Sequence, residues 1–210
     1  MRNSVKFVVA GILAVAASAA QAVPVVTLST SGVTTTAVGG ATVIDFNGGT
    51  CGYASCDGNY QVVNTSVSGQ YAQPAGTNSF YLTVPNPISN GSATFGLGTQ
   101  ADYFGLYWGS TDSYNSISFL SGGNVIATYS GTNLVGQFAN GNQVDYSSNR
   151  YINFWFSGET FDSVRLTSNG FAFESDNHAF RTASVPEPGS VALLGLGLVG
   201  LGLARRRKAA

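Results

Sequence analysis

The central part of the sequence predicts an all-β fold, built as an antiparallel sandwich or barrel. Three observations support this prediction. Glycine is abundant, with 27 of 210 residues, while only 9% of the residues are charged. Short runs of β-branched and aromatic residues, which suit a pleated sheet, recur about every ten residues between turn signals such as NGG, DGN and SGG. No segment between residues 23 and 184 shows the 3.6-residue period of an amphipathic helix.

Short apolar or alternating segments are each predicted to form a strand. They are 25–28, 42–46, 61–67, 79–84, 92–97, 102–108, 116–120, 125–129, 151–156, 163–167 and 171–174. Two hairpins are expected, one joining 116–120 to 125–129 through Ser-Gly-Gly-Asn and one joining 163–167 to 171–174 through Ser-Asn-Gly. The segment 151–156 is nearly all apolar and is predicted to be a central strand.

Residues 1–22 have the layout of a secretory signal peptide. Arg2 and Lys6 form a positive start, an apolar stretch follows, and the sequence AQA provides a small-x-small cleavage site. We therefore expect an N-terminal signal helix that signal peptidase removes. The mature, exported chain would begin at Val23, and residues 23–184 would form the β domain.

Export affects the interpretation of the two cysteines, Cys51 and Cys56. A C-x4-C pair in a glycine-rich turn of an exported chain is most simply a local disulfide. Closing so short a loop stabilises the fold by about 2 kcal/mol in the chain-entropy model. Free thiols and half of a zinc site are the alternatives, although the chain has a single histidine and a structural zinc ion takes four ligands.

Residues 185–210 combine three parts in a fixed order. Pro186, Glu187 and Pro188 come first, an apolar run covers 189–204, and a basic cluster follows. A helix over the apolar run would be about 24 Å long, which is somewhat short of a hydrocarbon core of about 30 Å but can cross with local thinning. We expect one C-terminal transmembrane helix, stopped on the cytoplasmic side by Arg205, Arg206, Arg207 and Lys208.

This order of parts resembles the PEP-CTERM sorting signal. The resemblance implies export in Gram-negative bacteria that make extracellular polysaccharide, with processing by the membrane protease-transpeptidase exosortase. The precursor would be held in the inner membrane and delivered to the cell surface or extracellular matrix. The stretches YFGLYWGSTDSYNSISFLSGG and FDSVRLTSNGFAFESDNHAF are similar to the bodies of exosortase-dependent surface proteins, which implies a jelly-roll-like sandwich.

The charges of the central domain exclude nucleic acid as a partner. Between residues 23 and 184 there are nine acidic residues against three basic ones. A surface with so few cations has no basic patch that could neutralise phosphates.

The segment 107–114, with the sequence YWGSTDSY, is the best candidate for a functional loop because aromatic residues meet a Gly-Ser-Asp turn there. Tyr107, Trp108 and Tyr114 are candidate glycan contacts, since aromatic rings stack on sugars. The alternative for alternating aromatics in a sandwich is burial in the core.

Candidates for metal binding and catalysis are few. Asp45, Glu174 and Asp176 are a candidate set for one structural Ca²⁺, which takes hard oxygen ligands, although no D-x-D-x-D-G loop is present. The single histidine, His178, follows two acidic residues and is expected to lie in an exposed loop. We therefore assign no catalytic residue and predict a protein that is not an enzyme and needs no cofactor.

The expected function is a structural or adhesive role within the exopolysaccharide or biofilm layer. A carbohydrate-binding module is the alternative, and it requires exposed aromatic residues in a groove. A secreted hydrolase is a third hypothesis, and it requires either His178 or two carboxylates to converge in a cleft.

Overall fold

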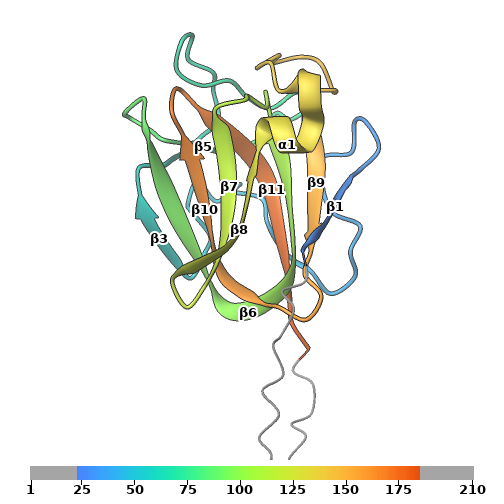
Figure 1. Cartoon of the computed structure of the whole chain (residues 1–210). Helices are drawn as coiled ribbons and strands as arrows, with labels where there is room; N and C mark the ends of the chain where they lie inside the picture. Colours follow the sequence, from blue (N-terminus) through green and yellow to red (C-terminus); the bar gives the residue numbers. More distant parts are fainter. Residues whose placement is uncertain (1–22, 185–210) are drawn as a thin grey trace, which may run out of the picture.

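The computed structural model describes residues 23–184, which form two stacked antiparallel layers of strands (Figure 1). The strands are β1 (Val25–Leu28), β2 (Thr42–Ile44), β3 (Ser55–Gly58), β4 (Gln61–Val63), β5 (Tyr81–Val84), β6 (Gly91–Gly109), β7 (Asn115–Ser121), β8 (Asn124–Ser130), β9 (Arg150–Trp155), β10 (Phe161–Ser168) and β11 (Phe173–Thr182). A short helix, α1 (Gly131–Val135), and a 3-10 turn, η1 (Gly136–Phe138), follow β8. The prediction of an all-β antiparallel fold is confirmed.

The long strand β6 belongs to both layers. Its first part, up to Gly96, pairs with β3 and β10, and its second part pairs with β11 and β9, while Ala101 between them pairs with both β10 and β11. One layer therefore contains β3, β6, β10, β7 and β8, and the other contains β4, β5, β11, β6, β9 and β1, with β2 on β11. Figure 1 shows β6 curving along the bottom of the molecule between these layers. Gly98 lies in this bend with a φ of +73°, a conformation that glycine adopts without strain.

Aromatic side chains fill the space between the layers. Phe104 of β6 contacts Phe119 of β7 and Phe161 of β10 edge to face, with ring centroids 5.8 and 6.4 Å apart. Phe154 of β9 also packs on Phe119, at 4.9 Å. Aromatic rings bury large apolar areas and favour such tilted contacts, so this cluster joins strands that are far apart in the sequence.

The first predicted hairpin is confirmed, and the second is wrong. Strands β7 and β8 pair directly, as predicted. Strand β10 instead pairs with β6 and β7, while β11 pairs with β2, β5 and β6 in the other layer. The chain changes layer after β10, and Phe173, at the start of β11, stacks there on Trp108 of the neighbouring strand β6 with ring centroids 3.9 Å apart.

Several strand boundaries also differ from the prediction. The segments 92–97 and 102–108 are parts of the single strand β6, and β11 continues to Thr182 rather than ending at residue 174. Strand β3 and helix α1 were not predicted. β3 is a short polar segment, and α1 has only five residues, so neither has a periodic apolar pattern. The nearly apolar segment 151–156 becomes β9, which is paired on both sides, with β1 and β6.

The predicted signal helix at 1–22 and the predicted transmembrane helix at 185–210 lie outside the described residues. Within residues 23–184, no helix is long and apolar enough to cross a membrane.

Candidate functional site

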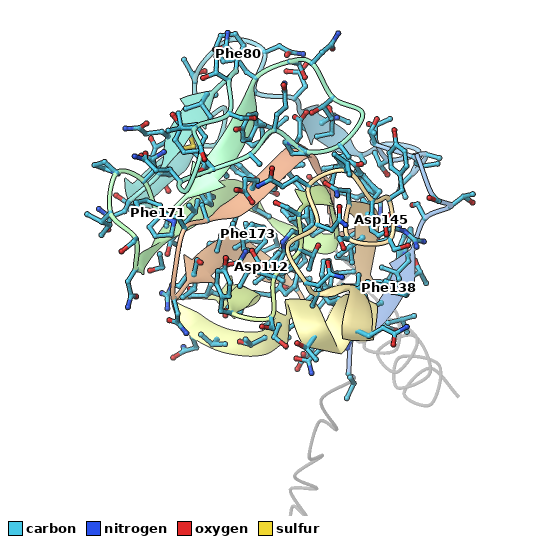
Figure 2. The ribbon with its side chains drawn as sticks, turned by 90° about the horizontal axis from the view of Figure 1, so that it is seen from above. Phe80, Asp112, Phe138, Asp145, Phe171 and Phe173 are labelled. Carbon is cyan, nitrogen blue, oxygen red and sulfur yellow. A yellow bond between two sulfur atoms is a disulfide. The ribbon has the colours of Figure 1, made fainter. Side chains whose placement is uncertain are left out.

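A polar pocket of about 620 Å³ opens between loops at one end of the sandwich. Its walls come from four segments that are distant in the sequence: 66–72, 110–114, 140–143 and 171–174. Figure 2 looks onto this end, with Asp112 near its centre and Phe171 to one side. The volume lies within the range of small-molecule sites in proteins. Both ends of the described chain lie at the opposite end of the sandwich, at the bottom of Figure 1.

Backbone and side-chain hydrogen bonds hold these loops together. The buried Asn149 accepts hydrogen bonds through Oδ1 from the N–H groups of Ala75 (3.0 Å) and Ser110 (2.9 Å). The N–H of Gly141 donates to the carbonyl of Thr111 at 3.0 Å. Three of the loops around the pocket are therefore tied to one another before any ligand binds, which lowers the entropy cost of binding.

Glu174, from β11, is one of the buried groups that line the pocket, and it is only 4% exposed. The N–H of Ala72 donates to its Oε1 at 3.0 Å, and the hydroxyl of Ser110 donates to its Oε2 at 2.8 Å. Burial, with a smaller contribution from the nearby charge of Asp112, raises the pKa of Glu174 to about 8, although these hydrogen bonds oppose the rise. The carboxyl group is therefore mostly protonated at pH 7.

Asp112 is the second carboxyl group in the pocket. It is half-buried, and this burial raises its pKa. A Cβ atom added to Gly141, which has a φ of +70°, would lie 2.5 Å from Asp112 Oδ1. The absence of a side chain at Gly141 thus allows the 140–143 wall to approach this carboxylate closely. Asp112 and Glu174 are two acidic groups that face one pocket.

The pocket has no basic side chain in its wall. The described residues include three arginines and no lysine. Arg150 donates to the carbonyl of Ser29, and Arg165 donates to Thr94 Oγ1 at 3.1 Å. Arg181 forms the one ion pair found within residues 23–184, with Asp102 at 2.9 Å. Within the part of the chain that the structure describes, no basic side chain thus lies beside the carboxyl groups of the pocket.

Two of the three candidate glycan contacts are wrong, because Tyr107 and Trp108 are fully buried. Trp108 stacks on Phe173 between the layers, and the hydroxyl of Tyr107 donates to the carbonyl of Ala75 at 2.7 Å. The alternation of side chains along β6 sends these neighbours to opposite faces, both of which are covered. Tyr114 is 39% exposed and does line the pocket, where its hydroxyl donates to the carbonyl of Phe171 at 2.8 Å.

The expectation of an exposed loop at His178 is wrong, because this residue lies in β11 and is completely buried. Its Nδ1 is 2.6 Å from the hydroxyl of Tyr53, and its Nε2 is 2.9 Å from Ser175 Oγ. Burial lowers the pKa of His178 to about 3, so the ring is neutral. The Asp176 carboxylate accepts from the N–H of Asn177 (2.7 Å) instead of orienting His178. This is a buried hydrogen-bonded group away from the pocket rather than a catalytic triad.

The candidate calcium ligands do not come together. Residues 23–184 contain no group of three or more His, Cys, Asp or Glu that could hold a metal ion. Asp45 accepts hydrogen bonds from the backbone and side chain of Asn47, and Asp176 accepts from Asn177. Glu174 instead lines the polar pocket.

The predicted disulfide between Cys51 and Cys56 is confirmed. It closes the loop that carries Tyr53, the partner of His178. The disulfide therefore supports a buried hydrogen bond of the core rather than the pocket.

Sequence reasoning found part of the pocket and missed the rest. The predicted functional loop 107–114 does contribute Ser110, Asp112 and Tyr114 to it. The walls at 66–72 and 140–143 were not predicted. Their only local signal is a run of small polar residues, which is also typical of any surface loop.

The fold and the site thus define a β-sandwich with a disulfide and a polar pocket between its loops. Residues 184–208 match the PEP-CTERM protein-sorting motif, which confirms the resemblance of Pro186–Pro188 and the residues after it. The chain therefore carries the sorting motif of exosortase-dependent proteins, and this motif indicates an exported precursor that is sorted to the cell surface. No curated protein matches the sequence.

Solved structures resemble the chain only weakly. CsCBM6-3 from Clostridium stercorarium, solved in complex with cellobiose, is 14% identical with a TM-score of 0.38, over 68% of this chain and 94% of that chain. A structure of a family 6 carbohydrate-binding module is 16% identical, with the same TM-score and coverage. The K2 cleaved adhesin domain of Lys-gingipain is 12% identical with a TM-score of 0.28, over 75% of this chain and all of that chain. Likenesses at this level carry no argument about binding.

Proposed function

We propose that this chain is an exosortase-sorted surface protein that binds a glycan in the loop pocket and thereby adheres within the exopolysaccharide layer. The observation that carries this proposal is the pocket itself, with about 620 Å³ of space and a wall of mostly polar side chains.

The chemistry of the pocket wall suits a ligand rich in hydroxyl groups. Gln70, Asn140 and Gln143 offer amide groups that both donate and accept hydrogen bonds. Tyr71 and Tyr114 add aromatic rings with polar tips, which contact sugars through both their faces and their hydroxyls. A mixture of a few placed polar groups and aromatic surface is typical of small-molecule sites.

The position of the pocket also supports an adhesive role. The described chain ends at the face of the sandwich opposite the pocket, and the sorting motif follows that end in the sequence (Figure 1). A precursor held through this motif would present the pocket away from its point of attachment. Glycans in the surrounding layer could then reach the loops.

A glycan array probed with the full-length chain in detergent tests this proposal. Tyr114→Ala should weaken binding about tenfold or more, because the ring is lost from the pocket wall. Tyr146→Ala is the matched control, since Tyr146 is also 39% exposed but does not line the pocket. Binding that is equally insensitive to both substitutions would place the glycan elsewhere and contradict the proposal.

Cleavage of the same glycan is a second candidate function, favoured by one observation. Glu174 and Asp112 place two carboxyl groups in one pocket, and a protonated acid beside a second carboxyl group is the equipment of glycosidases. Incubating the chain with each bound glycan tests this function. Release of new reducing ends by the natural chain but not by Glu174→Gln would establish cleavage, and intact glycan would exclude it for that ligand.

Processing by exosortase is tested separately, through the mass of the native C-terminus. Cells with the exosortase should yield a chain that lacks Arg205–Lys208, the residues that stop the proposed membrane helix. Cells without the exosortase should retain them. Retention in both kinds of cell would contradict the sorting mechanism without affecting glycan binding.

A further inference from the structure

Two acidic groups line the pocket, and no basic side chain among residues 23–184 lies in its wall. Asp112 and Glu174 both line it, while every arginine of the described residues lies elsewhere, bound to Ser29, Thr94 or Asp102. A half-buried carboxylate such as Asp112 is partly desolvated, so a charge of opposite sign nearby stabilises its ionised form.

We propose that the pocket prefers glycans bearing a free, protonated amine, such as a hexosamine polymer without its acetyl groups. This inference rests on the proposed function and names the class of glycan that the same pocket takes. The ammonium would lie against Asp112 and donate to its carboxylate a charge-assisted hydrogen bond, which is about twice as strong as a neutral one. The protonated Glu174 would serve as a neutral hydrogen-bonding group.

The same wall disfavours acidic glycans. A uronate carboxylate placed in the pocket would face Asp112 with no arginine or lysine to neutralise it. Two like charges in a partly buried site repel, and neither can be fully hydrated there. Polymers of uronic acids are therefore expected to bind more weakly than neutral polymers of the same length.

Four tetrasaccharides separate these alternatives by titration calorimetry on the full-length chain in detergent, at about pH 6.5, where amines are largely protonated. They are the tetramers of glucosamine, N-acetylglucosamine, glucose and galacturonic acid. The glucosamine tetramer should bind about ten- to a hundredfold more tightly than the glucose tetramer. This ratio should fall as the ionic strength rises from about 0.05 to 0.5 M, because salt screens the charge pair.

Asp112→Asn tests the residue that carries the preference. The substitution keeps the shape of the side chain and removes its charge, so the ratio of the two affinities should fall to about one. Asp57→Asn is the matched control, because Asp57 is exposed on β3 and lies outside the pocket wall. This control should retain the full ratio.

The outcomes distinguish the inference from the proposed function. Equal affinity for the glucosamine and glucose tetramers, or a preference that survives in Asp112→Asn, overturns the inference and leaves glycan binding intact. Tightest binding of the galacturonic acid tetramer also overturns it. Glycan binding that a chelator abolishes and Ca²⁺ restores assigns the acidic groups to a cation instead, which overturns it as well. Failure of all four tetramers to bind overturns both this inference and the proposed function for these sugars.

Discussion

Buried polar side chains on β11 differ in role although they are close in sequence. Glu174 lines the pocket, while His178, four residues later, is bonded within the core to Tyr53 and Ser175. Burial favours the neutral form of each group, so it raises the pKa of Glu174 to about 8 and lowers the pKa of His178 to about 3. Both shifts make the stability of the fold depend on pH.

Glu174→Gln should remove a loss of stability that the natural chain shows as the pH rises from about 4.5 to about 8. The folded chain keeps the Glu174 proton up to a pKa of about 8, while the unfolded chain releases it near the ordinary glutamate pKa of 4.5. The folded state therefore binds more protons between these values, and stability falls as the pH rises. From pH 6.5 to 8 the natural chain should lose about 1 to 2 kcal/mol, measured by denaturant unfolding. A natural chain and a variant with the same slope over this window would contradict the assignment.

Tyr53→Phe should destabilise the fold by about 1 to 3 kcal/mol, because it leaves one ring nitrogen of the buried His178 without a partner. Tyr60→Phe is the matched control. Both tyrosines pack on Phe95, but Tyr60 makes no side-chain hydrogen bond within residues 23–184. The control should change the free energy of unfolding by less than about 0.5 kcal/mol, and equal effects of the two substitutions would show that His178 does not need this bond.

Among the elements, β6 determines how the two layers meet. Its middle lies between β9 and β11, with Gly105 opposite Asn153 on one side and Ala179 on the other. The hydroxyl groups of Tyr103 and Tyr151 both point at Gly105 and occupy the space of a missing side chain. Tyr103 is held there by hydrogen bonds to Thr36 Oγ1 (2.7 Å) and Asn153 Oδ1 (2.8 Å).

Gly105→Ala should therefore destabilise the sandwich by about 1 to 3 kcal/mol, through overpacking. The added Cβ would contact Tyr103 Oη and lie 2.6 Å from Tyr151 Oη, and fixed rings cannot move aside without losing their hydrogen bonds. Gly39→Ala is the control, because a Cβ there meets no atom within 4 Å. A thermal melt in which both variants unfold at the same temperature as the natural chain would refute the tight packing at β6.

Local patterns predicted the elements better than their pairing. Val164 and Leu166 alternate with Arg165, and this period of two places both apolar residues in the core of β10, as the structure has it. The turn Ser-Asn-Gly after β10 looked like a hairpin signal, yet β11 pairs in the other layer, where its Phe173 stacks on Trp108 of the neighbouring strand β6. Such a contact between residues distant in the sequence has no signature in the local sequence.

At the scale of the whole molecule, the pocket forms only because folding brings together four segments that are distant in the sequence. The N–H of Ala72 reaches the carboxyl group of Glu174 across 102 positions in the sequence, and no local pattern predicts that meeting. The sequence did identify the loop 107–114, because its Gly-Ser-Asp turn follows a strong apolar strand. It misplaced Tyr107 and Trp108, since alternation alone does not reveal that both faces of β6 are covered.

The architecture separates the two functional ends of the protein. The pocket opens at the loop end of the sandwich, and the chain continues toward the sorting motif from the other end (Figures 1 and 2). Changes to the sorting motif should therefore leave glycan affinity unchanged, and substitutions in the pocket should leave sorting unchanged.

Chemical-shift mapping of a bound glycan by NMR tests the central claim most directly. Amide signals of the full-length chain in detergent are followed as a glycan that binds on the array is added. We expect the largest shifts in the segments 66–72, 110–114, 140–143 and 171–174, which form the pocket wall. Shifts that cluster on the exposed strand β8, with the pocket signals unmoved, would show that the glycan binds elsewhere and would contradict the account.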